Sequence, residues 1–410
     1  MSEAINRCRS CGGNTLEQIL SLGNTPLANS LPKADACDGE PSYPLDVVFC
    51  PACTLVQITE TVPPEVLFRD YLYFSSFSDT LLRHAEGLVD QMVQERALGP
   101  DSLAAEIASN DGYLLQFYKR AGVPVLGIEP ARNVARVAVE ERGIPTVTEF
   151  FGDELGRQLA GRGERADVLH ANNVLAHVAD LNGFVAGVRH FLKSGGVFVF
   201  EVPYVKDLVD HCEFDTIYHE HLCYFSLTAL AGLFRRHELE VTGVERVSIH
   251  GGSLRVRVQH AGAAQPRTEV ARLLEEERAW GVGEIGFYRA FAARVEQLKK
   301  SLRGLLSELK DGGARLAAYG AAAKGSTLLN YFRIGRETLD FVADRSTYKQ
   351  QRLMPGVRVP IVEPGRLLEE QPDYVLLLTW NFAEEILAQQ AEYRRRGGRF
   401  IIPVPEVKVV

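Results

Sequence analysis

The chain has 410 residues, of which 46% are hydrophobic and 24% charged, with a formal net charge of −8 at pH 7. This length predicts two or three domains of ordinary globular composition. An acidic balance without a basic stripe argues against nucleic acid as a partner, and no apolar run reaches the ~20 residues that span a membrane. Because the first residues also lack the apolar core of a signal peptide, the expected location is cytoplasmic.

Cysteine, proline and short apolar runs dominate the first part of the chain. Strands are expected at 16–22 and 45–49, and Pro63-Pro64 predicts a boundary, because proline donates no backbone hydrogen bond. Residues 81–98 then show the periodicity of an amphipathic helix. We therefore predict a first domain over residues 1–70.

Two Cys-x-x-Cys pairs occur in this domain, separated by 38 residues. Each pair can supply two thiolates to one tetrahedral zinc ion, and turn-forming residues surround both pairs. The alternative is two surface dithiols without metal. We predict a zinc site made by Cys8, Cys11, Cys50 and Cys53. Four sulfur ligands leave no coordination position open, so the predicted role is structural.

From residue 102 onward, strands and helices alternate, which predicts a parallel, doubly wound sheet. The expected strands are 103–108, 123–128, 167–171 and 197–201, with a further strand at 256–259. After mainly helical residues at 270–310, the same rhythm returns with strands at 315–319, 338–343, 374–378 and 399–403. The expected fold class is α/β, with a zinc-binding module, a central Rossmann-like domain over 71–250 and a second Rossmann-like domain over 251–410.

A run of small and acidic residues, Glu106-Ile-Ala-Ser-Asn-Asp-Gly112, lies between the first of these strands and a helix. Small residues there let the backbone approach a ligand closely. The Gly-x-Gly-x-x-Gly of dinucleotide sites is absent, whereas an acid at the strand end suits the methionine amine of S-adenosylmethionine. Glu129, at the end of the second strand, can accept hydrogen bonds from both ribose hydroxyls. The alternative is an ordinary turn with two surface acids.

A second loop of this kind, Gly320-Ala-Ala-Ala-Lys-Gly325, lies between a strand and a helix near the C-terminus. Its N–H groups and Lys324 can receive phosphates, which gives an acidic protein a local anion site. The alternative is a helix start with a lysine that faces solvent.

Further motifs extend over almost the whole chain. They include Leu22-Gly-x-x-Pro-Leu-Ala-Asn29, Cys50-x-x-Cys-x-Leu-Val-Gln57, Tyr71-x-Tyr-x-Ser-Ser76, Gly127-Ile-Glu-Pro130, Ala171-Asn-Asn173, Tyr218-His-Glu-His221, His250-Gly-Gly-Ser253, Tyr319-Gly-Ala-Ala-Ala-Lys-Gly325 and Trp380-Asn381. In order and spacing they resemble the sugar-nucleotide C-methyltransferases of deoxysugar biosynthesis, which act on TDP-4-keto-hexoses.

The resemblance implies a class I methyltransferase domain at 71–250, S-adenosylmethionine as cofactor, and a sugar-nucleotide-binding domain at 251–410. It implies that the cofactor is bound by Glu106, Ala108, Asn110, Gly112, Glu129, Pro130, Asn172 and Asn173. It implies that the sugar nucleotide is bound by Gly320, Ala323, Lys324, Gly325, Asp344, Trp380 and Asn381. One departure is Ala108, where many methyltransferases have glycine. Alanine is unstrained only at negative φ, and we expect its extra methyl to be tolerated.

Methylation of carbon requires a carbanion, which a neighbouring ketone stabilises as an enolate. The site therefore needs a base at that carbon and donors at the enolate oxygen. By resemblance the base is His221, with Tyr218 and Glu220 around it. A carboxylate such as Glu220 could orient an imidazole or bind a substrate amine or hydroxyl. His177 is expected at the carboxyl end of a strand, and Tyr73 is expected to close over the substrate. For each residue the alternative is a polar side chain without a catalytic role.

Other functions stay open at this point. An NAD-dependent oxidoreductase could use two Rossmann-like units, but the glycine pattern is absent. A metallohydrolase could use the histidines of 218–221, but their spacing lacks the i, i+4 geometry of zinc hydrolases. A scaffold built on the zinc module leaves the histidine cluster unexplained. The nearest alternative is an O- or N-methyltransferase. C3 is the favoured carbon for methylation, with C5 as the alternative. The sequence does not specify the sugar or the oligomeric state.

Overall fold

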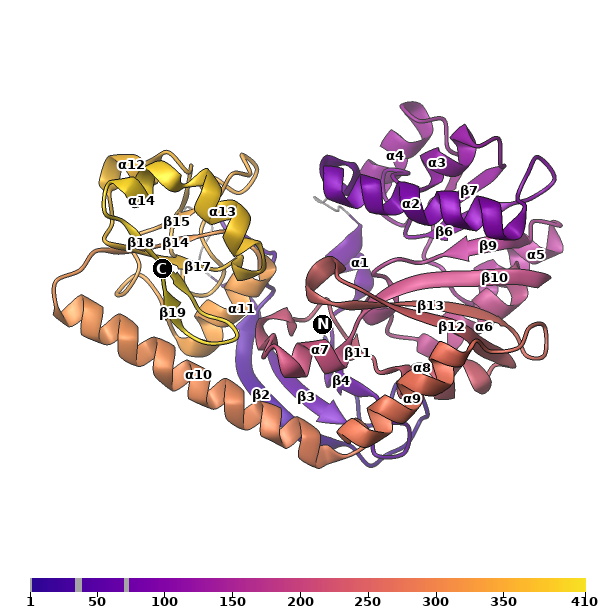
Figure 1. Ribbon diagram of the computed structural model, residues 1–410, viewed down its shortest axis with the longest axis horizontal. Coiled ribbons are helices and arrows are strands. Elements are labelled where there is room, and N and C mark those ends of the chain that lie inside the picture. Colours follow the sequence, from indigo (N-terminus) through magenta and orange to yellow (C-terminus); the bar gives the residue numbers. More distant parts are fainter. Residues whose placement is uncertain (1, 34–38, 70–73) are drawn as a thin grey trace.

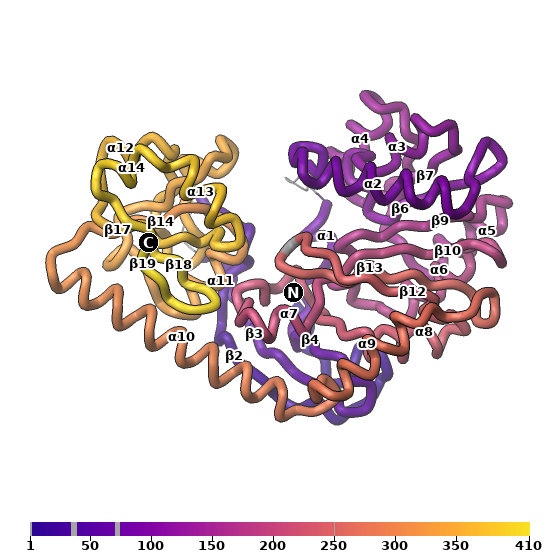
Figure 2. Tube along the Cα trace, viewed as in Figure 1, coloured from indigo at the N-terminus to yellow at the C-terminus, as the bar shows by residue number. Residues whose placement is uncertain are grey.

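The computed structural model describes residues 2–33, 39–69 and 74–410. Figures 1 and 2 show two α/β parts on either side of an antiparallel N-terminal sheet, with the long helix α10 (Ile285–Asp311) running beneath. One continuous hydrophobic core includes residues of all three parts. None of the described helices combines the length and the apolar character needed to cross a membrane.

The N-terminal part is a four-stranded antiparallel sheet in the order β11-β4-β3-β2. Three strands are local in sequence, namely β2 (Glu17–Pro26), β3 (Ser42–Phe49) and β4 (Val56–Ile58). The fourth, β11 (Cys223–Tyr224), comes from the central part and pairs with β4. A separate pair is formed by β1 (Glu3–Ala4) and β5 (Glu60–Thr61), and Pro64 begins the helix α1 (Pro64–Phe68). Because β11 belongs to the central part but pairs with β4, backbone hydrogen bonds join the zinc module to the central part.

The central part is a seven-stranded sheet in the order β12-β13-β10-β9-β6-β7-β8. Its parallel strands are β6 (Ala104–Ile107), β7 (Val125–Ile128), β8 (Thr146–Val147), β9 (Ala166–His170) and β10 (Leu192–Pro203). The antiparallel strands β12 (Leu239–Val247) and β13 (Ser253–His260) complete one edge. The expected strands at 103–108, 123–128, 167–171 and 197–201 are confirmed, whereas β8 and β12 were not expected. From β6 the chain adds β7 and β8 on one side and β9 and β10 on the other, so the strand order reverses at β6. At such a point α/β folds bind ligands beside the carboxyl ends of the strands.

Helices flank this sheet, as Figure 1 shows. They are α2 (Asp79–Arg96), α3 (Leu115–Arg120), α4 (Arg132–Glu140), α5 (Asp153–Gly161), α6 (Leu181–Phe191), α7 (Val205–Asp210) and α8 (Leu227–Arg235). In α2 the hydroxyl of Ser78 accepts a hydrogen bond from the N–H of Leu81, which caps the first turn. Leu81, Ala85, Leu88 and Met92 recur on one face and are buried, so the helix packs by this stripe.

After α9 (Thr268–Trp280) and α10, a six-stranded sheet follows in the order β16-β15-β14-β17-β18-β19. Its strands are β14 (Leu316–Tyr319), β15 (Val342–Ala343), β16 (Ile361–Val362), β17 (Tyr374–Leu377), β18 (Arg399–Ile402) and the antiparallel β19 (Lys408–Val409). Its helices are α11 (Ala323–Phe332), α12 (Arg366–Glu370), α13 (Ala383–Gln389) and α14 (Ala391–Arg395). These elements form a second Rossmann-like unit, called the C-terminal unit below.

The expected division at residues 250 and 251 does not coincide with the edge of the central sheet. Strand β13 lies beyond this division but pairs with β10 from Ser253 to Val258. The central sheet therefore extends past residue 250, because two antiparallel strands joined by a turn cannot be divided without breaking their shared hydrogen bonds.

Candidate functional site

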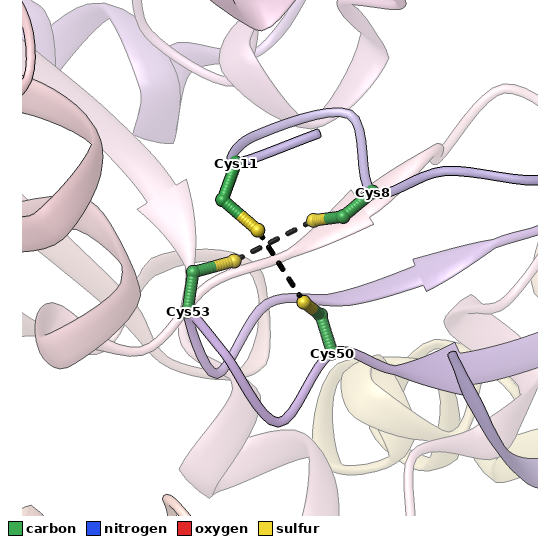
Figure 3. A group of neighbouring side chains, drawn as sticks. All are labelled: Cys8, Cys11, Cys50 and Cys53. Atoms are coloured by element: carbon green, nitrogen blue, oxygen red, sulfur yellow. Dashed lines mark hydrogen bonds between the residues drawn. The ribbon is translucent and has the colours of Figure 1, made fainter. Parts of the chain in front are cut away.

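The four paired cysteines converge on one point in the N-terminal part (Figure 3). Their sulfur atoms all lie within 4.8 Å of one another, and Sγ of Cys8 is 3.5 Å from Sγ of Cys53. A tetrahedral zinc ion with Zn–S bonds of ~2.3 Å separates its sulfurs by about 3.8 Å, so the four side chains fit the ion. Left-handed residues, Gly12 at φ 71° and Thr54 at φ 62°, close the two turns. The cysteines form a structural zinc site.

Glu129 is fixed by the backbone at the carboxyl end of β7. One carboxylate oxygen accepts the N–H of Asn110, and the other accepts the N–H of Ala131, each at 2.8 Å. Burial raises the pKa of Glu129 to about 6, although both hydrogen bonds oppose the rise. The carboxylate thus joins the loop after β6 to the end of β7, and each oxygen keeps a second lone pair for a ligand hydroxyl.

Glu106 lies at the end of β6 with 1% of its surface exposed. Its carboxylate is hydrogen-bonded to Tyr113, whose hydroxyl also interacts with Asn172. Burial, together with the nearby charges of Glu129 and Asp111, raises the pKa of Glu106 well above its usual range. One oxygen each of Glu106, Asp111 and Asn172 is buried without a hydrogen-bond partner among the described residues. Such acceptors fit the ammonium group of S-adenosylmethionine, which is both a donor and a cation.

The loop after β6 has a left-handed backbone at several positions. Ala108 has φ 52°, outside the negative range in which alanine is unstrained, and Asn110 and Gly112 have φ 51° and 77°. Left-handed φ crowds Cβ against the backbone, which costs an alanine roughly 1–2 kcal/mol. The residues that follow Ala108 are fixed from outside the loop, because the N–H of Asn110 donates to Glu129 and the carboxylate of Asp111 contacts Ser76 and Arg142. A glycine at 108 would remove the strain.

Asp111 was missed by the sequence reasoning, although it lies in the centre of this loop. It is fully buried, accepts the hydroxyl of Ser76 at 2.5 Å and pairs with Arg142 at 3.1 Å. Asn110 in turn accepts the N–H of Ser75 at 3.0 Å. The segment before α2 therefore lies directly over the loop after β6. Tyr73, the residue expected to close over the substrate, lies outside the described residues.

A second group of interacting side chains that the sequence reasoning missed lies around Glu201. Glu201, on β10, contacts Nε2 of His84 at 2.8 Å and accepts Nε of Arg255 at 2.8 Å. Burial opposes ionisation of Glu201, but His84 and the charge of Arg255 outweigh it and lower the pKa of Glu201. The carbonyl of Glu201 also accepts the N–H of Asn173, which has φ 56°. The turn that carries Asn172 and Asn173 is therefore fixed to β10.

The histidines expected to be catalytic lie together at the carboxyl ends of the central strands. The ring centroids of His177 and His221 are 4.9 Å apart, and those of Tyr218 and His221 are 4.1 Å apart. Nε2 of His221 lies 3.0 Å from the hydroxyl of Tyr218, and Nδ1 lies 2.8 Å from the carbonyl oxygen of Thr216. Burial lowers the pKa of His177, so this ring is neutral at pH 7.

The four side chains of Tyr218–His221 do not lie in one common site. The carboxylate of Glu220 accepts a hydrogen bond from Nδ2 of Asn29 at 2.7 Å, whereas its backbone carbonyl lies 2.6 Å from Nδ1 of His177. Of the two expected roles of the Glu220 carboxylate, this contact with Asn29 does not support the orientation of an imidazole, and binding of a substrate amine or hydroxyl stays a prediction. His219 points to the other side, where its Nε2 lies 3.1 Å from the carbonyl of Pro44. Residues 218–221 form a turn that is closed by the hydrogen bond from the N–H of His221 to the carbonyl of Tyr218, so the two outer side chains lie together while the two inner ones have other surroundings.

The loop after β14 occupies the matching position in the C-terminal unit. Gly320 has φ 95°, and the N–H of Ala321 donates to Asp344 at 2.7 Å. Gly325 lets α11 approach β17, since a Cβ there would lie 2.7 Å from Cβ of Leu378. Ala323 begins α11, and Asn381 lies in the short turn η5 (Trp380–Phe382).

The ammonium of Lys324 lies over the ring of Trp380, 4.7 Å from its centroid. It has no hydrogen-bond partner among the described residues, although its atom is buried. Trp380 donates its indole N–H to Asp215 at 2.7 Å, so this group is already engaged. Burial raises the pKa of Asp215, and the charge of Lys324 lowers it. The loop, the lysine and the tryptophan are thus brought together beside the central part.

The switch point at β6, with buried acids at the ends of β6 and β7, and the four-cysteine cluster define a Rossmann-like ligand-binding protein that carries a structural zinc module. Comparison with known proteins extends this. A zinc binding domain family matches residues 8–68, a methyltransferase domain family 84–244, and a C-methyltransferase C-terminal domain family 248–405. The chain is 39% identical to the C-methyltransferase NovU of Streptomyces niveus over 99% of its own length and 97% of that protein.

The chain therefore belongs to the C-methyltransferase family, and S-adenosylmethionine is its methyl donor. A ubiquinone biosynthesis O-methyltransferase of Methylobacterium sp. is 33% identical over only 25% of the chain and 42% of that protein. Among solved structures, a S-adenosylmethionine-dependent methyltransferase from Clostridium acetobutylicum ATCC 824 is similar over 44% of the chain and 92% of that structure, with 10% identity and a TM-score of 0.35.

Proposed function

We propose that the protein methylates a nucleotide-linked 4-keto sugar at the carbon beside the ketone, with C3 as the favoured position, and that His221 is the base. The observation that carries the proposal is the pairing of His221 with Tyr218 at the carboxyl ends of the central strands. A base next to a phenolic donor is what formation of an enolate requires. The name of NovU, a C-methyltransferase, supports carbon rather than oxygen as the acceptor.

The hydrogen bond between His221 and Thr216 sets the direction of proton transfer. A carbonyl oxygen only accepts, so Nδ1 carries a proton and Nε2 of His221 carries the lone pair. In the proposed step the C–H bond breaks, its proton moves to Nε2, and its electron pair moves into the ketone as an enolate. The hydroxyl of Tyr218, which donates to Nε2 in the resting protein, turns to the enolate oxygen. His177 stays neutral beside His221 and offers its own Nε2 to a substrate hydroxyl.

S-adenosylmethionine supplies an electrophilic methyl group. In the proposal Glu129 accepts the ribose hydroxyls, while Glu106 and Asn172 accept the ammonium group. The remaining cofactor contacts come from the backbone around Ala108, Asn110, Gly112, Pro130 and Asn173. Residues 74–76, which lie over this loop, exclude water, and Tyr73 belongs to the same segment.

For the sugar nucleotide we propose the C-terminal unit. The loop Gly320–Gly325 offers backbone N–H groups, and Lys324 offers a buried ammonium that lacks a hydrogen-bond partner among the described residues. An anionic diphosphate supplies the acceptors that such a donor needs. Asp344, Trp380 and Asn381 line the same edge of the sheet. Because Lys324 already lies near Asp215, it is held on the side of the unit that faces the histidines.

Product analysis tests the proposal. The protein is incubated with methyl-labelled S-adenosylmethionine and a panel of TDP-linked 4-keto sugars, and the product is examined by NMR. A new carbon–carbon bond next to the ketone is the expected result. In D₂O without the methyl donor, the α-proton of the accepted sugar should also exchange. A methyl group on oxygen or nitrogen, with no α-proton exchange, contradicts the carbanion mechanism.

A further inference from the structure

The segment Asp215–Ile217 is held by the C-terminal unit at both of its ends. At one end, Trp380 of η5 donates its indole N–H to the carboxylate of Asp215 at 2.7 Å. At the other, the hydroxyl of Thr327 on α11 donates to the carbonyl of Ile217 at 3.2 Å. Asp215 and Ile217 are 0% and 1% exposed, so these bonds are shielded from competing water.

Aromatic packing adds to this attachment. The ring of Phe214 stacks on that of Phe332 at the end of α11, with centroids 4.9 Å apart and an interplanar angle of 15°. Figure 1 shows α11 on the side of the C-terminal unit that faces α7 of the central part. The turn η3 (Phe214–Thr216) is therefore part of the central chain but packs on the C-terminal unit.

Thr216, between the two held residues, is the one whose carbonyl accepts Nδ1 of His221 at 2.8 Å. The peptide group between Thr216 and Ile217 is oriented within η3 by the hydrogen bond from the N–H of Ile217 to the carbonyl of Phe214 at 3.1 Å. The two contacts from the C-terminal unit hold the residues on either side of this peptide group, and so they support the direction of the Thr216 carbonyl. The direction of the carbonyl in turn fixes the tautomer and the ring plane of His221.

We infer that Trp380 and Thr327 are positioning residues for His221, which they act on through the segment Asp215–Ile217. The inference rests on the proposed function, in which His221 is the base. The C-terminal unit then contributes to the chemical step as well as to substrate binding. Because proton abstraction depends steeply on the alignment of donor and acceptor, a small displacement of the Thr216 carbonyl lowers the rate of this step.

Two conservative variants test the inference, Trp380→Phe and Thr327→Val. The first keeps an aromatic ring under Lys324 but removes the N–H donor, and the second keeps the shape but removes the hydroxyl. Each is expected to lower kcat about five- to ten-fold and to leave the affinity for S-adenosylmethionine unchanged. With ¹⁵N-labelled histidine, NMR should show His221 with its proton on Nδ1 in the wild type and a mixture of tautomers in both variants.

A matched control is Arg352→Ala. Arg352 donates to the carbonyl of Leu31 at 3.0 Å, so this variant also loses a contact between the C-terminal unit and the rest of the chain, but away from residues 215–217. Its kcat and His221 tautomer should equal those of the wild type. If Trp380→Phe and Thr327→Val keep both the wild-type kcat and the wild-type tautomer, the inference is wrong. If His221→Ala turns over at the wild-type rate, the proposed function fails instead, whatever the tautomer shows.

Discussion

Nδ1 of His221 lies 2.8 Å from the carbonyl oxygen of Thr216. His177 is held in the same way, with Nδ1 2.6 Å from the carbonyl oxygen of Glu220. Both imidazoles therefore carry their proton on Nδ1 and their lone pair on Nε2. Because backbone carbonyls do not titrate, neither tautomer depends on the ionisation of a carboxylate. This arrangement leaves Nε2 as the basic nitrogen of each neutral ring.

Replacement of His221 by alanine should lower kcat by ~10²–10⁴, the usual contribution of a general base. The affinity for S-adenosylmethionine should stay unchanged, since the proposed cofactor contacts lie around Glu129. His219→Gln is the matched control, because Nε2 of His219 faces the carbonyl of Pro44 rather than the proposed site. Fixed-time assays of methyl transfer measure kcat for both variants. Equal losses in the two would show that the loss comes from the fold of this turn.

Glu129→Gln should weaken binding of S-adenosylmethionine roughly ten- to hundred-fold, as expected for loss of a hydrogen bond to a charged group. The pKa of Glu129, raised to about 6 by burial, adds a pH dependence. The carboxylate is ionised above pH 6 and becomes protonated below it, so wild-type affinity should fall as pH drops from 7 to 5. Calorimetry should show a flat profile for Glu129→Gln, and Glu140→Gln, an exposed acid on α4, should behave as wild type.

Zinc should be present at about one ion per chain, and elemental analysis of protein purified without chelator measures it. Cys50→Ser removes one ligand and should lower both the zinc content and the yield of folded protein, because metal binding contributes to folding. Cys212→Ser removes a buried thiol that lies away from this site and serves as control. Protein that folds fully and contains no zinc would contradict a structural zinc centre.

Lys324→Gln should raise the KM for the sugar nucleotide about ten-fold, since an ammonium that binds phosphate makes a charge-assisted hydrogen bond. Cofactor affinity should change little, because Glu129 and Lys324 belong to different sheets. Lys300→Gln removes the same charge from an exposed position on α10 and should leave both constants as they are. If Lys324→Gln instead lost cofactor binding and kept the KM for the sugar nucleotide, the proposed assignment of the two ligands to the two sheets would be wrong.

Glu213→Gln should stabilise the protein at high pH. Burial raises the pKa of Glu213 to about 7, from about 4.3 in an unfolded chain. A carboxyl group whose folded pKa is raised destabilises the fold when ionised, so its cost is absent below pH 4.3 and complete above pH 7. The melting temperature of Glu213→Gln should exceed that of the wild type by about 2 °C at pH 8 and by nothing at pH 4.3. A difference that does not change with pH would exclude titration as its cause.

Local sequence determined the zinc ligands and the acids at the strand ends. A Cys-x-x-Cys turn brings its two sulfurs to one side whatever surrounds it, so Cys8 and Cys50 could be assigned from spacing alone. An acid directly after a buried parallel strand must lie at the carboxyl edge of the sheet, which places Glu106 and Glu129 together once the strands are recognised. The alternation of strands and helices predicted both Rossmann-like sheets in the same way.

The tertiary structure decided which way the side chains of the turn 218–221 face and what holds them. Glu220 meets Asn29, far away in the sequence, and Trp380 meets Asp215, contacts that no local pattern contains. The backbone at Ala108 also takes a positive φ that its side chain disfavours, and the residues that follow it are fixed by contacts of Asn110 with Glu129 and of Asp111 with Arg142. Spacing along the chain determines which residues share an edge or a turn. The direction of each side chain depends on packing between segments that the sequence separates, and only the folded protein brings these segments together.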